Sequence, residues 1–480
     1  MRCLAAAALL LVAACSFADD LEAGFQNPPA AARPRVWWHW MNGNITQDGI
    51  TEDLRWMKRV GIAGMQNFDA SLGTPQVVEK RLPFMTPDWK DAFRHAASLA
   101  ADLDLELAIA TSAGWSETGG PWVTPQQAMK KVVWSATLLD GGRRRKEPLP
   151  QPPNVAGPFQ QIVFQARPDE PSPQLYADTQ LLAFPVPQDE LADRAAAPQM
   201  SSAQGVIAGD VLRDGDLSKS VEIPVAADGK TWIKFEYPRA TTMSSATLTL
   251  PVRRAFPPPT QFDATLQASD DGTTYRTVAT LAASRADQRT VAFAPVTARW
   301  FRVEFVAGKP FERSVAEGTV TIQFPPPPSS LAITELALHP RMHVNRFVEK
   351  AGFAAASDYY AIDTPVAPRT SIVPKDSVVD LTGKLRPDGT LDWVAPAGTW
   401  TVLRMGYSLT GHTNGPASPE ATGLEVDKLN PAHVRNYLQH YLDMYEGATG
   451  KDLIGRRGLR ALLSDSYEAG AQNWTENMLA

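Results

Sequence analysis

The chain has 480 residues, of which 44% are hydrophobic and 20% are charged. An ordinary domain has roughly 100 to 200 residues, so this length and composition exclude a single small module, a largely disordered chain and a polytopic membrane protein. The formal net charge of -6 argues against a nucleic-acid partner, because phosphate binding needs a clustered basic face.

The N-terminal segment predicts export. An apolar run over residues 4–14 follows a short cationic start, and this run is too short to span a bilayer. Two processing sites are open: cleavage after Ala18, which makes residues 1–18 a signal peptide, or a lipobox that lipidates Cys15. The protein is therefore expected in the periplasm, on the outer membrane as a lipoprotein, or outside the cell. A lipid on Cys15 is the single membrane contact that this pattern predicts.

Strand and helix patterns alternate between residues 35 and 110. In the first helical pattern, Ile50, Leu54 and Met57 fall on one face. Strands that are joined by helices form parallel sheets with right-handed crossovers. The predicted strands cover residues 36–40, 62–68 and 105–110, and the predicted helices cover residues 46–60 and 86–103.

The parallel sheet could be an open sheet or a (β/α)8 barrel. No G-x-G-x-x-G motif follows the first strand, so a dinucleotide-binding open sheet has no motif support. Polar and aromatic side chains gather where the strands end, which is the catalytic face of a barrel. Asp69 is expected in a loop after the second strand, and Trp37 and Trp89 are expected in the core. The predicted sugar-binding residues of this region are His39, Trp40, Asn42, Asn44, Asp69 and Trp115.

A different pattern begins after a proline-rich stretch. Short alternating runs predict antiparallel β structure, and a helix over residues 431–447 and a buried strand over residues 459–463 then resume the earlier pattern. The fold class is α/β, a partial (β/α)8 barrel interrupted by antiparallel β-sandwich insertions. The expected parts are a signal peptide (1–18), the first βα units (33–140), a connector (141–204), a β-sandwich (205–340), a second β-rich module (341–410) and a return to the barrel (411–480).

Two carboxylates follow the last predicted strand. Asp465 and Glu468 occupy the position from which barrel enzymes project catalytic groups, and cleavage of a glycosidic bond needs two carboxyl groups. A helix-capping pair is the alternative. Glu425 lies in an acidic loop that is either part of a site or a solvated turn. His412 and His433 have no third ligand nearby, so the sequence does not predict zinc.

Four sequence blocks resemble glycoside hydrolase family 106, the α-L-rhamnosidases of bacterial polysaccharide degradation. The resemblance implies a (β/α)8 catalytic barrel with β-sandwich insertions, and calcium-dependent hydrolysis of terminal α-L-rhamnosyl linkages with inversion. The implied partner is a rhamnose-containing polysaccharide or oligosaccharide. The four blocks are residues 38–44 (WHWMNGN), 113–125 (AGWSETGGPWVTP), 419–428 (PEATGLEVDK) and 464–474 (SDSYEAGAQNW).

The resemblance also implies roles for individual residues. Glu468 is expected to be one catalytic carboxylate, the general acid. Its partner should lie roughly 6.5 to 9.5 Å away, and family members place it after the fourth block, so the chain is expected to be an N-terminal portion. The calcium ligands stay unassigned. Further expected sugar contacts are Glu425, Asp465, Asn473 and Trp474.

A non-catalytic function stays open as an alternative. The segment over residues 205–340 resembles discoidin-like carbohydrate-binding sandwiches in residues 266–272 (LQASDDG) and 299–303 (RWFRV). The chain could therefore be a carbohydrate-binding or surface protein, or an inactive fragment of the hydrolase.

Overall fold

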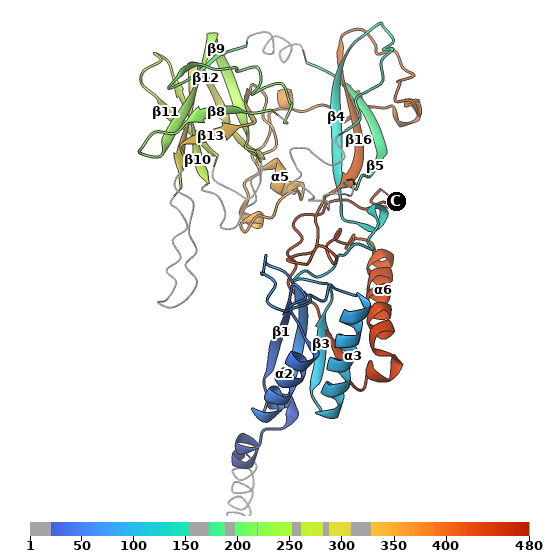
Figure 1. Cartoon of the computed structure of the whole chain (residues 1–480). Helices are drawn as coiled ribbons and strands as arrows, with labels where there is room; N and C mark the ends of the chain where they lie inside the picture. The colour runs from blue at the N-terminus through green and yellow to red at the C-terminus, as the bar shows by residue number, and fades with distance from the viewer. Residues whose placement is uncertain are drawn as a thin grey trace, which may run out of the picture. The chain divides into compact units, whose positions relative to one another are not determined.

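The structure is a computed structural model that describes residues 21–152, 171, 173–187, 197–217, 219–251, 261–281, 288–308 and 328–479. The described chain forms two compact units (Figure 1). The first combines Met1–Ala128 with Thr413–Ala469, and the second combines Met129–His412 with Gly470–Ala480. The predicted export signal, with both of its processing sites, lies outside the described residues.

The first unit contains a four-stranded parallel sheet in the order β1-β2-β3-β17. It confirms the predicted run of strands and helical crossovers, and it adds the last predicted strand next to β3. A closed (β/α)8 barrel stays a prediction. The described residues form a single parallel sheet, and this sheet has four strands with open edges at β1 and β17. The strands are β1 (Arg35–Met41), β2 (Gly64–Ala70), β3 (Glu106–Ala110) and β17 (Leu459–Leu463), and the helices are α2 (Gln47–Arg59), α3 (Pro87–Asp102) and α6 (Pro431–Thr449).

Local signals explain where α2 and α3 begin. The Thr46 side chain accepts a hydrogen bond from the Gly49 amide at 3.0 Å, and α2 buries Ile50, Leu54 and Met57 as predicted. Thr86 caps α3 in the same way, and Pro87 occupies its first turn, where the missing amide hydrogen costs nothing. The apolar faces of both helices then pack on the sheet.

Three sequence expectations for this unit are wrong. Asp69 lies inside β2 rather than in a loop, because β1 and β2 pair as far as Met41 and Ala70. Trp37 is 62% exposed, since it alternates with Trp38 and Trp40, which face the helices. The strand β17 is not fully buried: its Leu462 is 42% exposed, because β17 is an edge of the sheet that the described residues form.

The second unit contains an antiparallel β module, as the alternating runs predicted. Its main sheet runs β11-β10-β12-β9-β6-β7, with β14 added to β9, and its small sheet pairs β8 with β13. Both sheets contribute to one hydrophobic core. The strands are β6 (Gln199–Ser202), β7 (Gly205–Val206), β8 (Val221–Pro224), β9 (Lys230–Thr249), β10 (Phe262–Ser269), β11 (Arg276–Leu281), β12 (Gln288–Ala307), β13 (Ser330–Ile333) and β14 (Glu335–His339).

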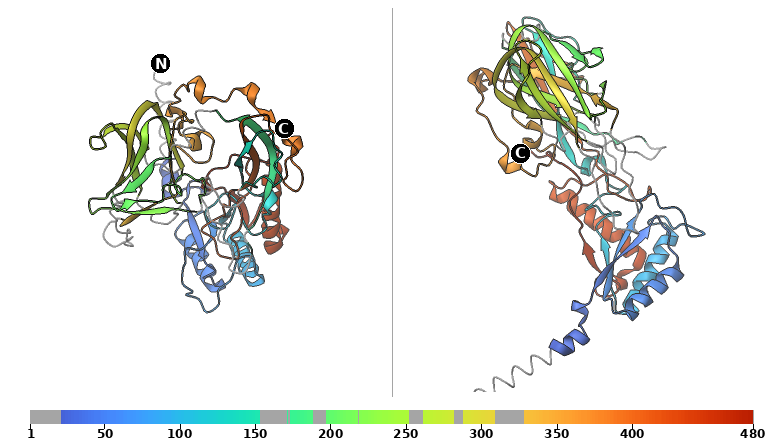
Figure 2. Two further views of the ribbon diagram at one scale, coloured as in Figure 1. Left: turned by 90° about the horizontal axis from the view of Figure 1, so that it is seen from above. Right: turned by 90° about the vertical axis from the view of Figure 1, so that its left-hand side faces the viewer.

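A third antiparallel sheet has the order β15-β5-β16-β4. Figure 2 shows the ribbon from two further sides. The strand β4 was expected with the first βα units. Instead it forms a continuous ladder with β16, from Lys130 opposite Leu409 to Asp140 opposite Thr399, and so belongs to the second unit. The strands are β4 (Lys130–Asp140), β5 (Tyr176–Pro185), β15 (Val379–Asp380) and β16 (Thr399–Leu409), and the short helix α5 (Phe347–Lys350) precedes β15.

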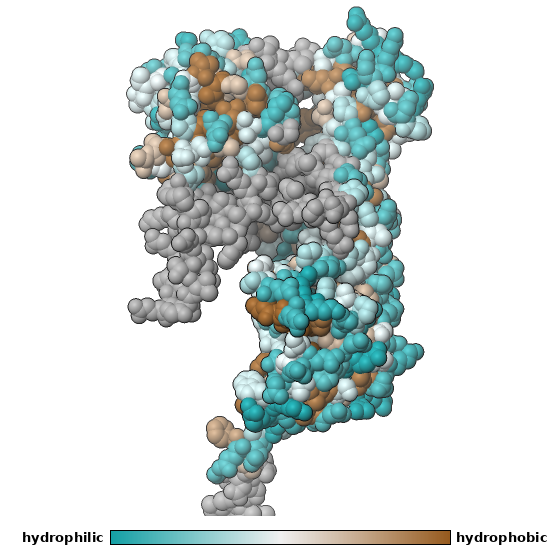
Figure 3. All heavy atoms as spheres, viewed as in Figure 1, coloured by the Kyte–Doolittle hydropathy of each residue, from teal (hydrophilic) through white to brown (hydrophobic). Residues whose placement is uncertain are grey.

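The described helices contain none that is long and apolar enough to cross a membrane. The face of the first unit that is visible in Figure 3 carries small hydrophobic patches among mostly hydrophilic residues. Single exposed apolar side chains of this kind are ordinary in folded proteins.

Candidate active site

Asp465 and Glu468 follow β17 directly, at the carboxyl end of the parallel sheet. Glu468 is exposed, and the Ser466 hydroxyl donates a hydrogen bond to its Oε1 at 3.3 Å. The Ser466 amide donates to Asp465 Oδ1 at 2.7 Å, which shapes the turn between the two carboxylates. Neither residue caps a helix, since residues 464–479, the described chain after β17, contain no helix. Both carboxylates are therefore presented on a loop at the sheet edge.

Glu425 lies in a buried charged cluster, so the alternative of a solvated turn is wrong. Its side chain is 1% exposed, and its Oε2 accepts hydrogen bonds from Thr118 Oγ1 at 2.5 Å and from Lys428 Nζ at 2.7 Å. Lys428 Nζ also donates to Thr118 Oγ1 at 3.0 Å. A buried carboxylate is tolerated only when it is paired and hydrogen-bonded in this way.

The same cluster reaches the loop that carries Glu468. Lys428 Nζ lies 5.5 Å from the ring centre of Tyr467, within the range of a cation–π contact. Burial, and then the charges of Glu425 and Glu117, raise the pKa of Tyr467 to about 12. Sequence reasoning missed Thr118, Lys428 and Tyr467 as members of one site, because they come from three loops that are far apart along the chain.

His39 and Trp115 meet at this sheet edge, as the sequence predicted. Trp115 Nε1 donates a hydrogen bond to His39 Nε2 at 3.1 Å, so the neutral imidazole carries its proton on Nδ1. The His39 ring stacks on Phe68 at 5.2 Å. Burial lowers the pKa of His39, which favours the neutral ring at physiological pH.

Asn42 and Asn44 hold a loop instead of presenting free amides. Asn42 Nδ2 donates to the Thr74 carbonyl at 3.1 Å, and Asn44 Nδ2 donates to the Pro75 carbonyl at 3.1 Å. Asn44 Oδ1 also accepts from the Val77 amide at 2.9 Å. The prediction that these two amides bind sugar directly therefore gains no support from their hydrogen bonds.

Trp40 and Asp69 are buried between the sheet and its helices, which argues against their predicted contact with substrate. Trp40 is 1% exposed and packs edge-on against Trp89. Asp69 is 4% exposed; its Oδ2 accepts from Trp89 Nε1 at 2.9 Å, and its buried Oδ1 has no hydrogen-bond partner among the described residues. Burial raises the pKa of Asp69 to about 7, against the opposing effects of the Trp89 bond and of Arg81.

Asn473 and Trp474 belong to the second unit, where they complete its packing. Asn473 Oδ1 accepts from the Val132 amide at 3.0 Å, and its Nδ2 donates to the Ala351 carbonyl at 3.0 Å. Trp474 stacks on Tyr407 with ring centres 6.5 Å apart. These contacts give both residues a structural role, in contrast to the predicted sugar contacts.

The side chains do not form a recognisable site for calcium. In the described ranges, no group of three or more His, Cys, Asp or Glu side chains is placed to share a metal ion. Calcium needs six to eight oxygen ligands, several of them carboxylates. The described residues therefore identify no set of calcium ligands, and no catalytic step below depends on the ion.

Two known proteins match nearly the whole of this chain. A rhamnosidase structure from Novosphingobium sp. PP1Y is 47% identical with a TM-score of 0.78, and the match covers 96% of this chain and 41% of that chain. A curated protein of Formosa agariphila, provisionally named a β-glucuronidase, is 25% identical over 456 residues, which are 95% of this chain and 24% of the relative. The chain thus spans less than half of either relative.

A family model described as α-L-rhamnosidase, glycoside hydrolase family 106, matches residues 26–480. This match covers nearly the whole chain and includes all four sequence blocks. The chain therefore belongs to the α-L-rhamnosidase family of glycoside hydrolases, family 106.

Proposed function

We propose that this chain contributes to an exported hydrolase that removes terminal α-L-rhamnosyl groups from polysaccharides or oligosaccharides, with inversion at the anomeric carbon. The observation that carries the proposal is the place of Asp465 and Glu468 directly after a parallel strand, in a chain of a glycoside hydrolase family. The apolar N-terminal run supports export. The parallel sheet is proposed to be part of a (β/α)8 barrel.

In the proposed reaction Glu468 is the general acid. It gives its proton to the glycosidic oxygen as the bond from that oxygen to the anomeric carbon breaks. A water molecule attacks the opposite face of the sugar and loses a proton to a second carboxylate. The exposure of Glu468 in the free protein leaves it accessible to a leaving group. Asp465 is proposed to bind the sugar beside it.

His39 and Trp115 are proposed to form the sugar-binding wall of this site. Trp115 Nε1 keeps His39 Nε2 occupied, so the Nδ1 hydrogen of His39 is the donor that remains for a sugar hydroxyl. The buried Glu425 cluster is proposed to act indirectly, because Lys428 lies against Tyr467, the residue that precedes Glu468.

The proposed role of Glu468 is tested by Glu468→Gln, which removes the acidic proton but keeps the shape of the side chain. Release of L-rhamnose from an aryl α-L-rhamnoside and from a rhamnose-capped oligosaccharide is measured for the hydrolase to which this chain contributes, with and without the substitution. We expect the rate to fall by roughly 100-fold or more on the oligosaccharide, whose leaving group needs protonation.

The matched control is Glu52→Gln, which changes an exposed carboxylate on α2 and should leave the rate unchanged. Unchanged oligosaccharide hydrolysis by Glu468→Gln would refute its role as the acid. A wild-type protein that releases no rhamnose, yet cleaves a β-glucuronide, would refute the proposed substrate class.

A further inference from the structure

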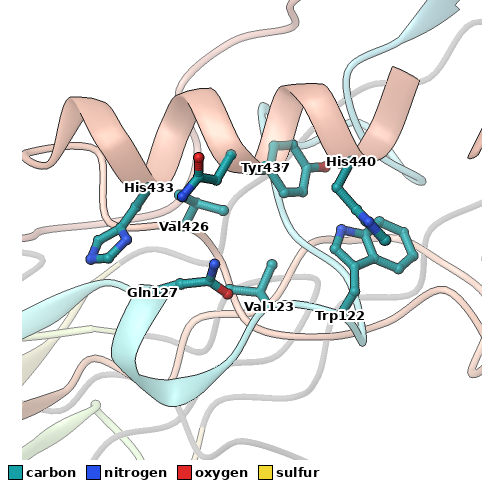
Figure 4. Close-up of a pocket in the computed structure, with 8 residues that line it drawn as sticks. Trp122, Val123, Gln127, Val426, His433, Tyr437 and His440 are labelled. Carbon is teal, nitrogen blue, oxygen red and sulfur yellow. The ribbon is translucent and has the colours of Figure 1, made fainter. Parts of the chain in front are cut away.

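A pocket of about 160 Å³ lies in the first unit, between α6 and the loop that follows β3. Figure 4 shows His433, Tyr437 and His440 projecting from α6 toward Trp122, Val123 and Gln127 on the facing chain. None of the predicted sugar-binding or catalytic residues lines this pocket. It is therefore a separate feature from the loop that carries Glu468.

The walls of the pocket are aromatic and aliphatic, and they are held in place. The rings of Trp122 and Tyr437 lie 21° from parallel with centres 6.4 Å apart, and His440 lies 5.8 Å from Trp122. The Tyr437 hydroxyl donates to the Thr111 carbonyl at 2.8 Å, which fixes the ring. Val426 closes one side of the pocket and is itself buried.

Several polar groups around the pocket have hydrogen-bonding capacity to spare. Trp122 Nε1 is buried and has no acceptor among the described residues. Gln127 Oε1 accepts from Thr124, and the structure shows no acceptor within the described chain for the Gln127 NH₂ group. Asn436 contributes a side-chain amide from the opposite wall. Unused donors that converge on a partly apolar pocket are typical of a binding site.

The chemistry of the lining selects a class of ligand. The residues that line the pocket include no Lys, Arg, Asp or Glu, so no permanently charged side chain of the lining would offset the hydration that an ionic ligand loses. A volume of about 160 Å³ equals about five water molecules at roughly 30 Å³ each, which suits one sugar ring rather than a chain. We propose that this pocket is a secondary binding site for a single neutral pyranose.

The test follows the imidazole signals of His433 and His440 by NMR, assigned with His433→Gln and His440→Gln, while L-rhamnose is added to the full chain. We expect saturable shifts of these two signals in the wild-type protein. The same shifts are expected in Glu468→Gln, because Glu468 does not line the pocket. Asn436→Ala, which removes one amide, and Trp122→Phe, which removes the indole N–H together with one of the two fused rings, should each weaken the apparent affinity by about tenfold.

Any one of four outcomes would overturn the proposal. The signals of His433 and His440 could stay unchanged up to saturating sugar, or only the His39 signal could move. Affinity could be unaltered by both Asn436→Ala and Trp122→Phe. Alternatively, D-glucuronate could bind as well as L-rhamnose, which would show that the pocket does not select a neutral ring. Rhamnose release by the same proteins is measured separately, so failure of the pocket and failure of the hydrolase are distinguishable.

Discussion

Asp69 is a carboxyl group in an environment that disfavours its charged form. A carboxyl group that is buried with one unpartnered oxygen favours the protonated form. Trp89 satisfies the other oxygen, so the neutral acid fits its surroundings while the carboxylate does not. The first unit therefore carries a titratable group inside its packing layer, between the sheet and α3.

This burial predicts a pH-dependent effect of Asp69→Asn on stability. The pKa of Asp69 is raised from 3.8 to about 7 in the folded protein, so its favourable contribution is fully present below about pH 4 and is lost as the pH rises to 7. Asparagine does not ionise. The variant should therefore gain stability over the wild type between pH 4 and 7, by up to about 4 kcal/mol.

Thermal unfolding at several pH values between 4 and 8 measures this difference. Glu52→Gln, at an exposed carboxylate, serves as the control and should show no such trend. A difference between Asp69→Asn and the wild type that does not change with pH would contradict the buried, protonated acid.

At the scale of the element, α6 is positioned by its first turn. Asn430 Oδ1 accepts hydrogen bonds from the amides of Ala432 and His433 at 3.0 and 3.4 Å, and Pro431 starts the helix. The helix then buries Tyr437, Tyr441 and Tyr445. A cap satisfies amide groups that have no partner inside the helix.

Asn430→Ala should lower the free energy of unfolding by about 1 kcal/mol, because these two amides lose their acceptor. Denaturant unfolding monitored by far-ultraviolet circular dichroism measures the change. Asn436 lies in the same helix and is exposed. Asn436→Ala should therefore not lower the free energy of unfolding, because alanine favours the helix. Equal losses in the two variants would contradict the capping role of Asn430.

Local elements were predictable, whereas their long-range partners were not. The start of α2 at Thr46 and its buried face follow from a capping residue and a period of 3.6, which are visible within 15 residues. The alternation in β4 is equally visible, but its partner β16 lies more than 250 residues away, and alternation does not identify a partner.

The candidate site shows the same limit. The position of Glu468 after a strand was predictable from the apolar run before it. The contact of His39 with Trp115 was predictable because His39 lies near the carboxyl end of β1 and Trp115 follows β3 in the same sheet. The pairing of Glu425 with Thr118 depends on how two loops meet, which no local pattern encodes. Asp69 was misplaced because the predicted strand, residues 62–68, begins and ends two residues before β2 does.

At the scale of the whole molecule, the β module between Gln199 and His339 has a core of its own. Every residue of its main hydrophobic cluster, from Met200 to Leu338, comes from this segment. A domain has its own hydrophobic core and can in principle fold alone. The module should therefore fold without the rest of the chain.

Residues 197–346 expressed alone should unfold cooperatively with heat and keep the circular dichroism of a β protein. Phe301 is fully buried in the core of the module. Phe301→Ala should therefore lower the free energy of unfolding of the isolated module by about 3 to 5 kcal/mol. An isolated module that binds a hydrophobic dye and shows no cooperative transition would contradict its autonomy.

The placement of β17 beside β3 has a consequence for biosynthesis. These neighbouring strands are separated by roughly 350 residues of sequence. At roughly 5 to 20 residues per second, a ribosome needs about 20 to 70 seconds between making one strand and the other. During that interval the edge of β3 that pairs with β17, which includes Leu107 and Ile109, lacks this partner. A nascent chain with an open parallel edge is a natural client for chaperones, and slowing translation should make it more prone to aggregate.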